Sequence, residues 1–288
     1  MSDKYSLFYK LIVLSLFIFV ALACKDKDAP DSSVKPGSGN QEPSPPSAYS
    51  QLVWSDEFNG TQIDLSKWQH EVNDKGGGNN ELQYYTAEPK NSYIENGNLV
   101  IEAIKEEYKT RKYTSARLNT KNKADLLYGK IEVLAKLPKG QGIWPAIWML
   151  PTAEEFGGWP KSGEIDIMEI VGHKPNTLHA TVHYGPAWPK NQYKGTSYIL
   201  PTGDFSDDFH LFSIIWDKNL IRWYIDGTHY FTIKPEDLSP HIYPFNAKFH
   251  MILNLAVGGN WPGNPDATSV FPQKMMVDYV RVYKRPGA

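Results

Sequence analysis

The amino-acid sequence predicts an all-β protein, folded as a sandwich or barrel of short strands. From Leu52 onward, runs rich in Val, Ile, Trp and Tyr alternate with clusters of Gly, Pro, Asn and Asp. Helical periodicity never extends beyond a turn or two in this region, and no repeat of fixed length is visible, which disfavours a propeller or a β-helix. Because this texture is uniform, we expect residues 49–288 to form one domain.

The N-terminal segment 1–23 has the features of a signal peptide. Lys4 and Lys10 precede an apolar stretch over residues 11–23. This stretch is shorter than the roughly 20 residues that a membrane-spanning helix requires, but it has the size of the apolar part of a signal peptide. It is followed by Cys24, the only cysteine of the chain, so a disulfide within one chain is impossible.

Cys24 is either an incidental thiol in an uncleaved segment or a lipid-modified residue at the N-terminus of the mature protein. The segment resembles a bacterial lipoprotein signal, with Ala21 in the place where Leu is commonest. The charged residues 25–28 are similar to sequences that route lipoproteins to the cell surface, or they simply begin a solvated tether. The resemblance implies an exported protein with a lipid anchor in the outer membrane or cell surface of a Gram-negative bacterium, in either leaflet.

Residues 24–48 predict a flexible, partly extended tether. Prolines, serines, glycines and charged residues dominate this segment, and it contains no aromatic side chain. Such a composition cannot offset the entropy cost of ordering the chain. The net charge of -2 gives no electrostatic reason to expect nucleic acid as a partner, and we expect a monomer.

Three segments of the domain predict strands of different kinds. In residues 130–137 the odd positions are apolar and most even positions are charged, which predicts a strand with one buried face. In residues 275–283 both faces carry apolar side chains, which predicts a strand packed between two layers. Asp226-Gly227, in the middle of residues 222–231, supplies the positive φ angles of a tight primed turn, so we expect a hairpin there.

The most informative segment is 163–171, where acidic residues interrupt an apolar strand. Glu164 and Asp166 share one face of a regular strand, whereas Glu169 falls on the opposite face. Burying charge without a purpose is costly. A β-bulge near Ile167-Met168 would absorb one residue and bring all three acids onto the same face, and we predict that bulge.

Acids placed in this way suit a glycosidase, a cation site or a solvent-facing strand edge. With the bulge, the Cα atoms of Glu164 and Glu169 lie about 13 Å apart by the strand rise, and side chains that lean together would shorten the gap between their carboxyl groups. A separation of about 5–5.5 Å specifies a retaining glycosidase. In such an enzyme Glu164 is the ionised nucleophile and Glu169 is the protonated acid and later the base, while Asp166 orients Glu164 and helps to keep the proton on Glu169.

Residues 163–169 resemble the active-site signature of glycoside hydrolase family 16, in the longer, bulge-containing form typical of its laminarinases. The resemblance covers most of residues 51–285 and includes residues 54–58, 79–85, 114–118, 142–150, 254–263 and 278–283. It implies a jelly-roll β-sandwich with a concave substrate cleft, the three acids along the cleft floor, and no cofactor for catalysis.

A cleft for a glucan should combine aromatic rings, which stack on the C–H faces of sugars, with amides and charged groups that bind hydroxyls. Trp144 and Trp148 are four residues apart and share one strand face, which suits either the cleft or the sandwich core. The resemblance implies that Trp144, Trp148 and Trp159 lie at subsites beside the acids. It also implies that Asn80 and Arg117 bind hydroxyls further from the bond that is cut.

The other tryptophans and two histidines divide between cleft and core. Trp188 and Trp261 lie in loops rich in Pro and Gly, where an exposed aromatic residue more often serves binding than packing. His179 and His183 share strand parity, and we expect His183 to be the neighbour of the sugar or of the acid/base residue, with His179 in a structural role. No zinc signature accompanies them. The core is expected to contain Trp54, Trp216 and Trp223.

The family resemblance also implies a structural calcium ion on the convex side, away from the chemistry. The matching positions are Glu57 and Gly97, through their backbone carbonyl groups, and Asp278. The alternative is that Asp278 merely caps a strand edge. Carboxylate and carbonyl oxygens are the ligands that Ca²⁺ prefers.

From this resemblance we expect a retaining endo-1,3-β-glucanase of the laminarinase type that acts on a β-glucan polysaccharide or oligosaccharide. Mixed-linkage β-1,3-1,4-glucan and red-algal galactan remain alternative substrates, because catalytic acids report the reaction and not the sugar. The loops around Trp159, Trp188 and Trp261 resemble those of β-1,3-glucanases. A non-catalytic, surface glycan-binding lipoprotein is a third interpretation, which the presence of all three acids disfavours. The sequence does not distinguish glycan transfer from hydrolysis.

Overall fold

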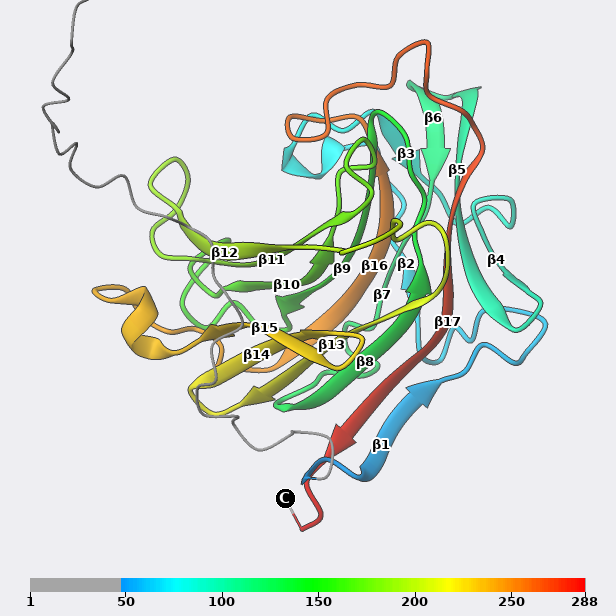
Figure 1. Cartoon of the computed structure of the whole chain (residues 1–288). Coiled ribbons are helices and arrows are strands. Elements are labelled where there is room, and N and C mark those ends of the chain that lie inside the picture. The colour runs from blue at the N-terminus through cyan, green and yellow to red at the C-terminus, as the bar shows by residue number, and fades with distance from the viewer. Residues whose placement is uncertain (1–47, 288) are drawn as a thin grey trace, which may run out of the picture. The chain divides into compact units, whose positions relative to one another are not determined.

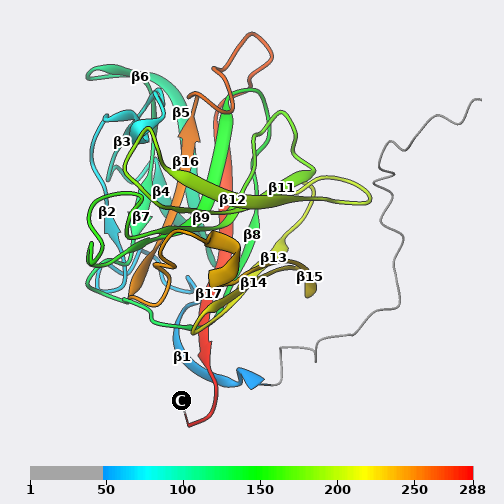
Figure 2. The same ribbon diagram turned by 90° about the vertical axis from the view of Figure 1, so that its left-hand side faces the viewer.

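The protein is a β-sandwich. The computed structural model describes residues 48–287, and its strands form two sheets that stack on each other (Figure 1). The turned view in Figure 2 shows β1 and the C-terminal end of β17 side by side at the lower end of the sandwich, where the two strands pair antiparallel. The all-β prediction is therefore confirmed.

The larger sheet has 10 strands and the smaller sheet has 7. In spatial order, the larger sheet contains β15 (Thr228–Ile233), β14 (Leu220–Ile225), β13 (His210–Asp217), β8 (Gly129–Lys136), β17 (Gln273–Lys284), β5 (Asn98–Tyr108), β6 (Arg111–Ser115) and β3 (Gln83–Tyr85), with β1 (Gln51–Asp56) on β17 and β4 (Ser92–Glu95) on β5. The smaller sheet contains β12 (Gln192–Ile199), β11 (Thr177–Tyr184), β10 (Glu164–Glu169), β9 (Ile143–Pro151), β16 (Phe249–Val257), β7 (Arg117–Asn119) and β2 (Gln69–His70). The 3-10 helices η2 (Gly76–Gly78) and η3 (Pro235–Leu238) lie in connecting segments.

Two strand predictions are confirmed. In β8, Ile131, Val133 and Ala135 are buried, while the polar residues between them are partly exposed. β14 and β15 form the predicted hairpin, with Asp226 at φ 48° and Gly227 at φ 78° in its two-residue turn. In both places the local sequence pattern and the observed structure agree.

The prediction for β17 was wrong in one respect. Met275, Val277 and Val280 are buried, but the other face of the strand is only partly covered. A register shift between Val277 and Tyr279 keeps one set of side chains turned inward. On the outer face, the guanidinium of Arg281 lies 3.7 Å from the centre of the Tyr279 ring. The Tyr279 ring on this face is therefore covered by a neighbouring cation and not by a second layer of the fold.

The core contains two of the three tryptophans that were assigned to it. Trp216 and Trp223 are completely buried between the sheets. Trp54 is only partly buried, and its ring packs edge to face on the buried Trp68 at 5.9 Å. Trp54 thus lies at the margin of the core that it was predicted to join.

The predicted bulge in β10 is present. Asp166 and Glu169 are three residues apart, whereas their partners on β11 are only two apart. The ladder between β10 and β9 shifts at the same place, between Asp166 and Met168. The extra residue therefore falls at Ile167-Met168, and both of these side chains are buried.

Trp223, from the opposite sheet, holds this bulge. Its indole Nε1–H donates a buried hydrogen bond of 2.9 Å to the backbone oxygen of Asp166. A bulge disrupts the ladder and leaves its extra residue unpaired, and a buried carbonyl group without a partner costs about 1–3 kcal/mol. The hydrogen bond therefore stabilises β10 in its irregular form and links it to β14.

The targeting segment, the tether and Cys24 lie outside the described residues, so the predictions made for them stay predictions. Within residues 48–287, no helix has both the length and the apolar character needed to cross a membrane.

We predict that Trp223→Phe lowers the free energy of unfolding by about 1–3 kcal/mol, because the ring volume is largely kept but the Asp166 carbonyl loses its partner. Denaturant unfolding measures this loss. Hydrogen exchange should also become faster in β10.

The matched control is Trp216→Phe. Trp216 is equally buried, and its Nε1–H donates a hydrogen bond of 2.8 Å to the backbone oxygen of Phe245 and not to the bulge of β10. We expect a similar loss of stability with β10 still protected. Equal protection of β10 in both variants would show that Trp223 does not support the bulge.

Candidate active site

A cleft of about 1100 Å³ crosses the outer face of the smaller sheet. Its floor is formed by side chains of β7, β9, β10, β11, β12 and β16, and loop residues complete its walls. Sites for small molecules usually measure about 300–1,000 Å³. The cleft therefore suits an extended ligand of several units.

The strand registers place the three acids in three rows across the cleft floor. Each row consists of an acid of β10, its partner on β11 and the next partner on β12. The rows are Glu164–His183–Tyr193, Asp166–Thr181–Gly195 and Glu169–His179–Ser197. All of these residues line the cleft except Asp166, which is only 2% exposed. The bulge thus brings the three acids to one face of the sheet, with the middle one below the surface.

Glu169 has the properties of a proton donor. Burial raises its pKa well above the ordinary value, and the neighbouring acids Asp166 and Glu164 raise it further. The indole Nε1–H of Trp144 donates a hydrogen bond of 3.0 Å to Oε1 of Glu169, which opposes part of this shift. Glu169 therefore retains its proton to a higher pH than a solvated glutamate, as a general acid requires.

The surroundings of Asp166 favour its neutral form. Burial raises its pKa well above the ordinary value, and the charge of Glu164 and a hydrogen bond to Glu164 act in the same direction. Nε2 of His183 lies 3.3 Å from Oδ2 of Asp166. A protonated Asp166 can donate its hydrogen to Glu164, which fits the orienting role that the sequence predicted for it.

Glu164 is oriented by two neighbours. The indole Nε1–H of Trp159 donates a hydrogen bond to Oε2 of Glu164, and Asp166 supplies the second contact. The carboxylate of Glu164 lines the cleft, where it can reach a bound ligand.

A cation site was one alternative for the acids. Among the His, Cys, Asp and Glu side chains of residues 48–287, the group that could hold a metal ion is Glu164, Asp166 and His183, with ligand atoms within 4.8 Å of one another. Metal binding requires deprotonated ligands, whereas burial and Glu164 favour the protonated form of Asp166. The arrangement is thus better suited to proton transfer than to holding a cation.

Aromatic rings flank both cleft glutamates. Trp144, beside Glu169, packs edge to face on Trp261 at 5.4 Å, and Trp261 does the same on His179 at 4.9 Å. On the other side, the Trp159 ring lies 5.9 Å from the ring of His183. His179, which the sequence placed in a structural role, also lines the cleft.

Trp148 and Arg117 are in contact with each other. The Arg117 guanidinium lies 4.6 Å from the centre of the Trp148 ring and forms an ion pair with Glu71 at 3.1 Å. The indole Nε1–H of Trp148 donates a hydrogen bond of 2.7 Å to Asn254. Both Trp148 and Arg117 line the cleft, as predicted, but Arg117 covers part of the Trp148 ring. Trp148 therefore presents less free ring surface than Trp159 does.

The remaining predicted contacts lie at the cleft margins. Trp188 is 74% exposed and Trp261 is 41% exposed, and both line the cleft. Asn80 is exposed and donates a hydrogen bond of 2.9 Å to Asn260. The cleft lining contains its neighbour Asn79 but not Asn80 itself.

The sequence did not single out Glu81, although it is a buried acid at the cleft. Its Oε2 accepts hydrogen bonds from Gln83 at 2.6 Å and from Tyr85 at 3.2 Å. Asn254 donates to the hydroxyl of Tyr85 at 3.1 Å and accepts from Trp148. Glu81 thus begins a buried polar chain that positions Trp148. An acid among polar residues between two strands gives no local signal of this role.

The positions expected to bind calcium lie near the junction of β1, β5 and β17 in the larger sheet. β17 pairs with β5 over Gln273–Val277 and with β1 over Val280–Lys284, so Asp278 lies between the two pairings, next to the end of β1 and the start of β5. Gly97 immediately precedes β5, and a side chain built on it would come within 3.7 Å of Asn59. The registers thus place the end of β1 and the start of β5 on either side of Asp278 along β17.

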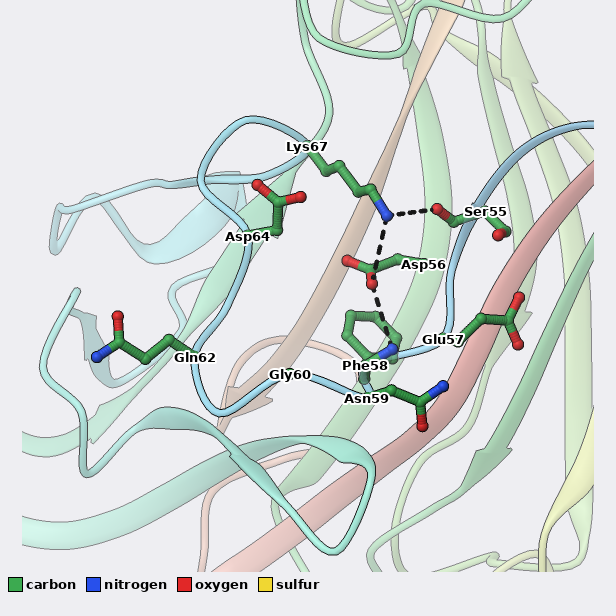
Figure 3. Close-up of a pocket in the computed structure, with 9 residues that line it drawn as sticks. All are labelled: Ser55, Asp56, Glu57, Phe58, Asn59, Gly60, Gln62, Asp64 and Lys67. Atoms are coloured by element: carbon green, nitrogen blue, oxygen red, sulfur yellow. Dashed lines mark hydrogen bonds and ion pairs between the residues drawn. The ribbon is translucent and has the colours of Figure 1, made fainter.

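Two contacts are consistent with an oxygen-lined cation site at this junction. The carboxylate of Glu57 is taken up by Arg281, with hydrogen bonds of 3.0 and 2.7 Å, which leaves its backbone oxygen as the expected ligand. Oδ1 of Asn98 is buried without a hydrogen-bond partner. Figure 3 shows the adjoining pocket, in which Glu57 points away from Lys67 and the Lys67 ammonium contacts Asp56 at 3.6 Å. The Lys67 ammonium thus disfavours a cation in this pocket.

The chain is similar to known carbohydrate-active proteins. Residues 65–281 match the sequence profile of Glycosyl hydrolases family 16. Glucan endo-1,3-beta-glucosidase A1 of Niallia circulans is 42% identical over 258 residues, which are 81% of this chain but only 38% of that protein. Beta-glucanase of Rhodothermus marinus is 45% identical over 251 residues, which are 81% of this chain and 85% of that protein.

Among solved structures, the laminarinase catalytic domain from Thermotoga maritima superposes with a TM-score of 0.77 at 48% identity, over 81% of this chain and 98% of that one. The likeness assigns the sandwich to the jelly-roll class, as the sequence predicted.

The contacts of Glu169 predict opposite pKa shifts in two variants. Trp144→Phe should raise the pKa of Glu169, because the carboxylate loses a hydrogen-bond donor. Glu164→Gln should lower it, because a neighbouring negative charge is removed. NMR titration of ¹³C-labelled glutamate carboxyl groups measures both shifts.

Trp148→Phe is the matched control, because the Trp148 indole donates to Asn254 and not to an acid. It should leave the pKa of Glu169 unchanged. Shifts of the same sign in Trp144→Phe and Glu164→Gln would contradict this account of the site.

Proposed function

The chain belongs to glycosyl hydrolase family 16, and from this premise we propose that it is a retaining endo-1,3-β-glucanase of the laminarinase type. The proposal depends on one observation: the bulged strand β10 places Glu164 and Glu169 on the floor of a long aromatic cleft, with Asp166 between them just below the floor. A buried acid beside an oriented carboxylate is the pair that glycoside hydrolysis requires.

The first half of the reaction forms a covalent intermediate. A carboxylate oxygen of Glu164 attacks the anomeric carbon, and the bond from that carbon to the glycosidic oxygen breaks. Glu169 gives its proton to the departing oxygen, which leaves as the hydroxyl group of the released glucan. Asp166 keeps Glu164 oriented during the attack through the hydrogen bond between them.

The second half restores the enzyme. Glu169, now a carboxylate, removes a proton from water, and the water oxygen bonds to the anomeric carbon as the bond to Glu164 breaks. Glu169 is protonated again and Glu164 is again a carboxylate. The two displacements each invert the anomeric carbon, so its configuration is retained.

The cleft and the relatives support a β-1,3-glucan as the substrate. Glucan endo-1,3-beta-glucosidase A1 and the Thermotoga laminarinase are named for that activity. Trp144, Trp159 and Trp261 offer ring faces and edges to the apolar faces of sugars. Because the cleft extends on both sides of the acids, an internal bond of a long chain can reach them.

A purely glycan-binding role accounts poorly for the acids. Keeping Glu169 and Asp166 buried beside Glu164 is costly, and binding of hydroxyl groups does not need a raised pKa. The same buried arrangement is what proton transfer to a leaving oxygen does need. We therefore favour hydrolysis over binding alone.

Export and anchoring through Cys24 are part of the proposal, supported by the sequence of residues 1–24. A surface-held enzyme of this type would meet polysaccharides too large to enter the cell. We further propose that it acts as a monomer, with a structural Ca²⁺ near Asp278 and without a cofactor for catalysis.

We predict that the purified protein cleaves laminarin internally with retention of anomeric configuration, and lichenan, agarose or carrageenan more slowly or not at all. Glu169→Gln should lower kcat by about 10²–10⁴-fold, since it removes the general acid. Glu164→Ser should abolish turnover, since it removes the nucleophile. Product sizing and ¹H NMR of the first-formed anomer are the measurements.

Glu155→Gln is the matched control, because Glu155 is exposed and does not line the cleft. It should match the parent. If the parent binds laminarin without cutting any of the four polymers, the protein is a glycan receptor and the proposal fails.

The calcium proposal predicts that Ca²⁺ raises the Tm of the parent but not that of Asp278→Asn. At a concentration of 100 times Kd, binding to the folded state stabilises it by about 2.7 kcal/mol. Calorimetry with and without chelator measures the difference. Asp208 is exposed, so Asp208→Asn is the control and its Tm should still rise with Ca²⁺. A parent whose Tm does not change with Ca²⁺ would contradict the calcium site.

A further inference from the structure

Tyr193 is a large aromatic residue that the fold leaves exposed at the cleft. It lies on β12, the edge strand of the smaller sheet (Figure 1). Its side chain is 72% exposed and lines the cleft. Burial of an aromatic ring is among the larger gains in folding, so a ring kept in solvent inside a cleft indicates contact with a ligand.

The register places Tyr193 in the same row as Glu164. Glu164 pairs with His183, and His183 pairs with Tyr193. Two strand spacings separate Tyr193 from the strand of the acids, which is about 10 Å. Because β11 and β9 flank β10 on opposite sides, Tyr193 and Trp148 lie on opposite sides of the acids.

A series of side-chain contacts leads from Glu164 to Tyr193. Trp159 donates a hydrogen bond to Glu164, and its ring lies 5.9 Å from the ring of His183. The His183 ring in turn lies 6.0 Å from the ring of Tyr193, with the planes inclined at 40°. The three rings thus form a continuous series that leads from the acid to the edge of the sheet.

The cleft continues along β12 beyond Tyr193. The next residue on the same face is Gly195, and a Cβ atom there would come within 2.5 Å of the Ala180 backbone oxygen and 2.9 Å of Thr181 Oγ1. The close approach of β11 and β12 therefore requires glycine at this position. Because Gly195 and Ser197 also line the cleft, a ligand bound beside the tyrosine ring can follow β12.

We propose that Tyr193 forms a sugar-binding subsite on the side of the acids opposite Trp148, and that it makes the enzyme prefer chains long enough to reach it. The ring would contact the C–H face of a glucosyl unit, with the hydroxyl group as a secondary contact. This inference rests on the proposed glucanase function and adds a specificity residue to it.

The test compares Tyr193→Ala, Tyr193→Phe and Ile199→Ala on laminari-oligosaccharides of increasing length. Ile199 is the matched control: it lies on the same strand and face, is 61% exposed and does not line the cleft. Steady-state kinetics give kcat and KM for each length, and reducing-end ¹⁸O labelling locates the bond that is cut. Circular dichroism checks that each variant is folded.

We expect Tyr193→Ala to raise KM roughly three- to tenfold on the longer oligosaccharides, the range of an aromatic contact, with kcat changed less than twofold. The penalty should vanish for chains too short to occupy the subsite, and the preferred cleavage position should shift along the chain. Tyr193→Phe should stay close to the parent because the ring is retained.

Equal KM values for parent and Tyr193→Ala at every length would overturn the inference, as would a penalty independent of length or matched by Ile199→Ala. These outcomes presuppose a parent that cleaves laminari-oligosaccharides. A parent that cleaves none of them would instead contradict the proposed glucanase function.

Discussion

The irregularity in β10 is the constraint on which the rest of the site depends. One extra residue between Asp166 and Glu169 turns the second glutamate to the face that already carries Glu164. The buried hydrogen bond from Trp223 to the Asp166 carbonyl fixes that irregularity from the opposite sheet. The catalytic geometry is therefore set by the packing of the two sheets and not by the cleft alone. A regular β10 would place Glu169 in the core.

Differences in burial then give the three acidic side chains different roles. Asp166 lies below the floor, where its neutral form is favoured. Burial and the charge of Glu164 favour the protonated form of Glu169, and Glu164 receives hydrogen-bond donors at the cleft surface. The indole of Trp144 limits how far the pKa of Glu169 rises, so that the group can still give up its proton. Different roles thus come from different surroundings, although all three side chains are carboxylic acids.

The sequence predicted features that depend on local pattern. Strand parity in 163–171 required the bulge, and Asp226-Gly227 specified the hairpin; both are present. What it missed depends on contacts between distant segments. On the outer face of β17 the Tyr279 ring is covered by a cation, Arg281, and the role of Tyr193 follows from a register across three strands. Shared parity put His179 and His183 on the same face, but a lone histidine is usually structural, so the sequence interpretation did not assign His179 to the cleft that it lines.

In the proposed reaction Glu164 attacks the sugar, and Glu169 gives and takes up the proton. Treating the protein with a 2-deoxy-2-fluoro laminaribioside that carries an activated leaving group tests these roles. The fluorine slows the second displacement and the activated leaving group speeds the first, so the glycosyl-enzyme accumulates. Peptide mass spectrometry then locates the added sugar. The account predicts one added glycosyl unit, on Glu164. A label on Glu169 or Asp166, or turnover without any covalent intermediate, would contradict it.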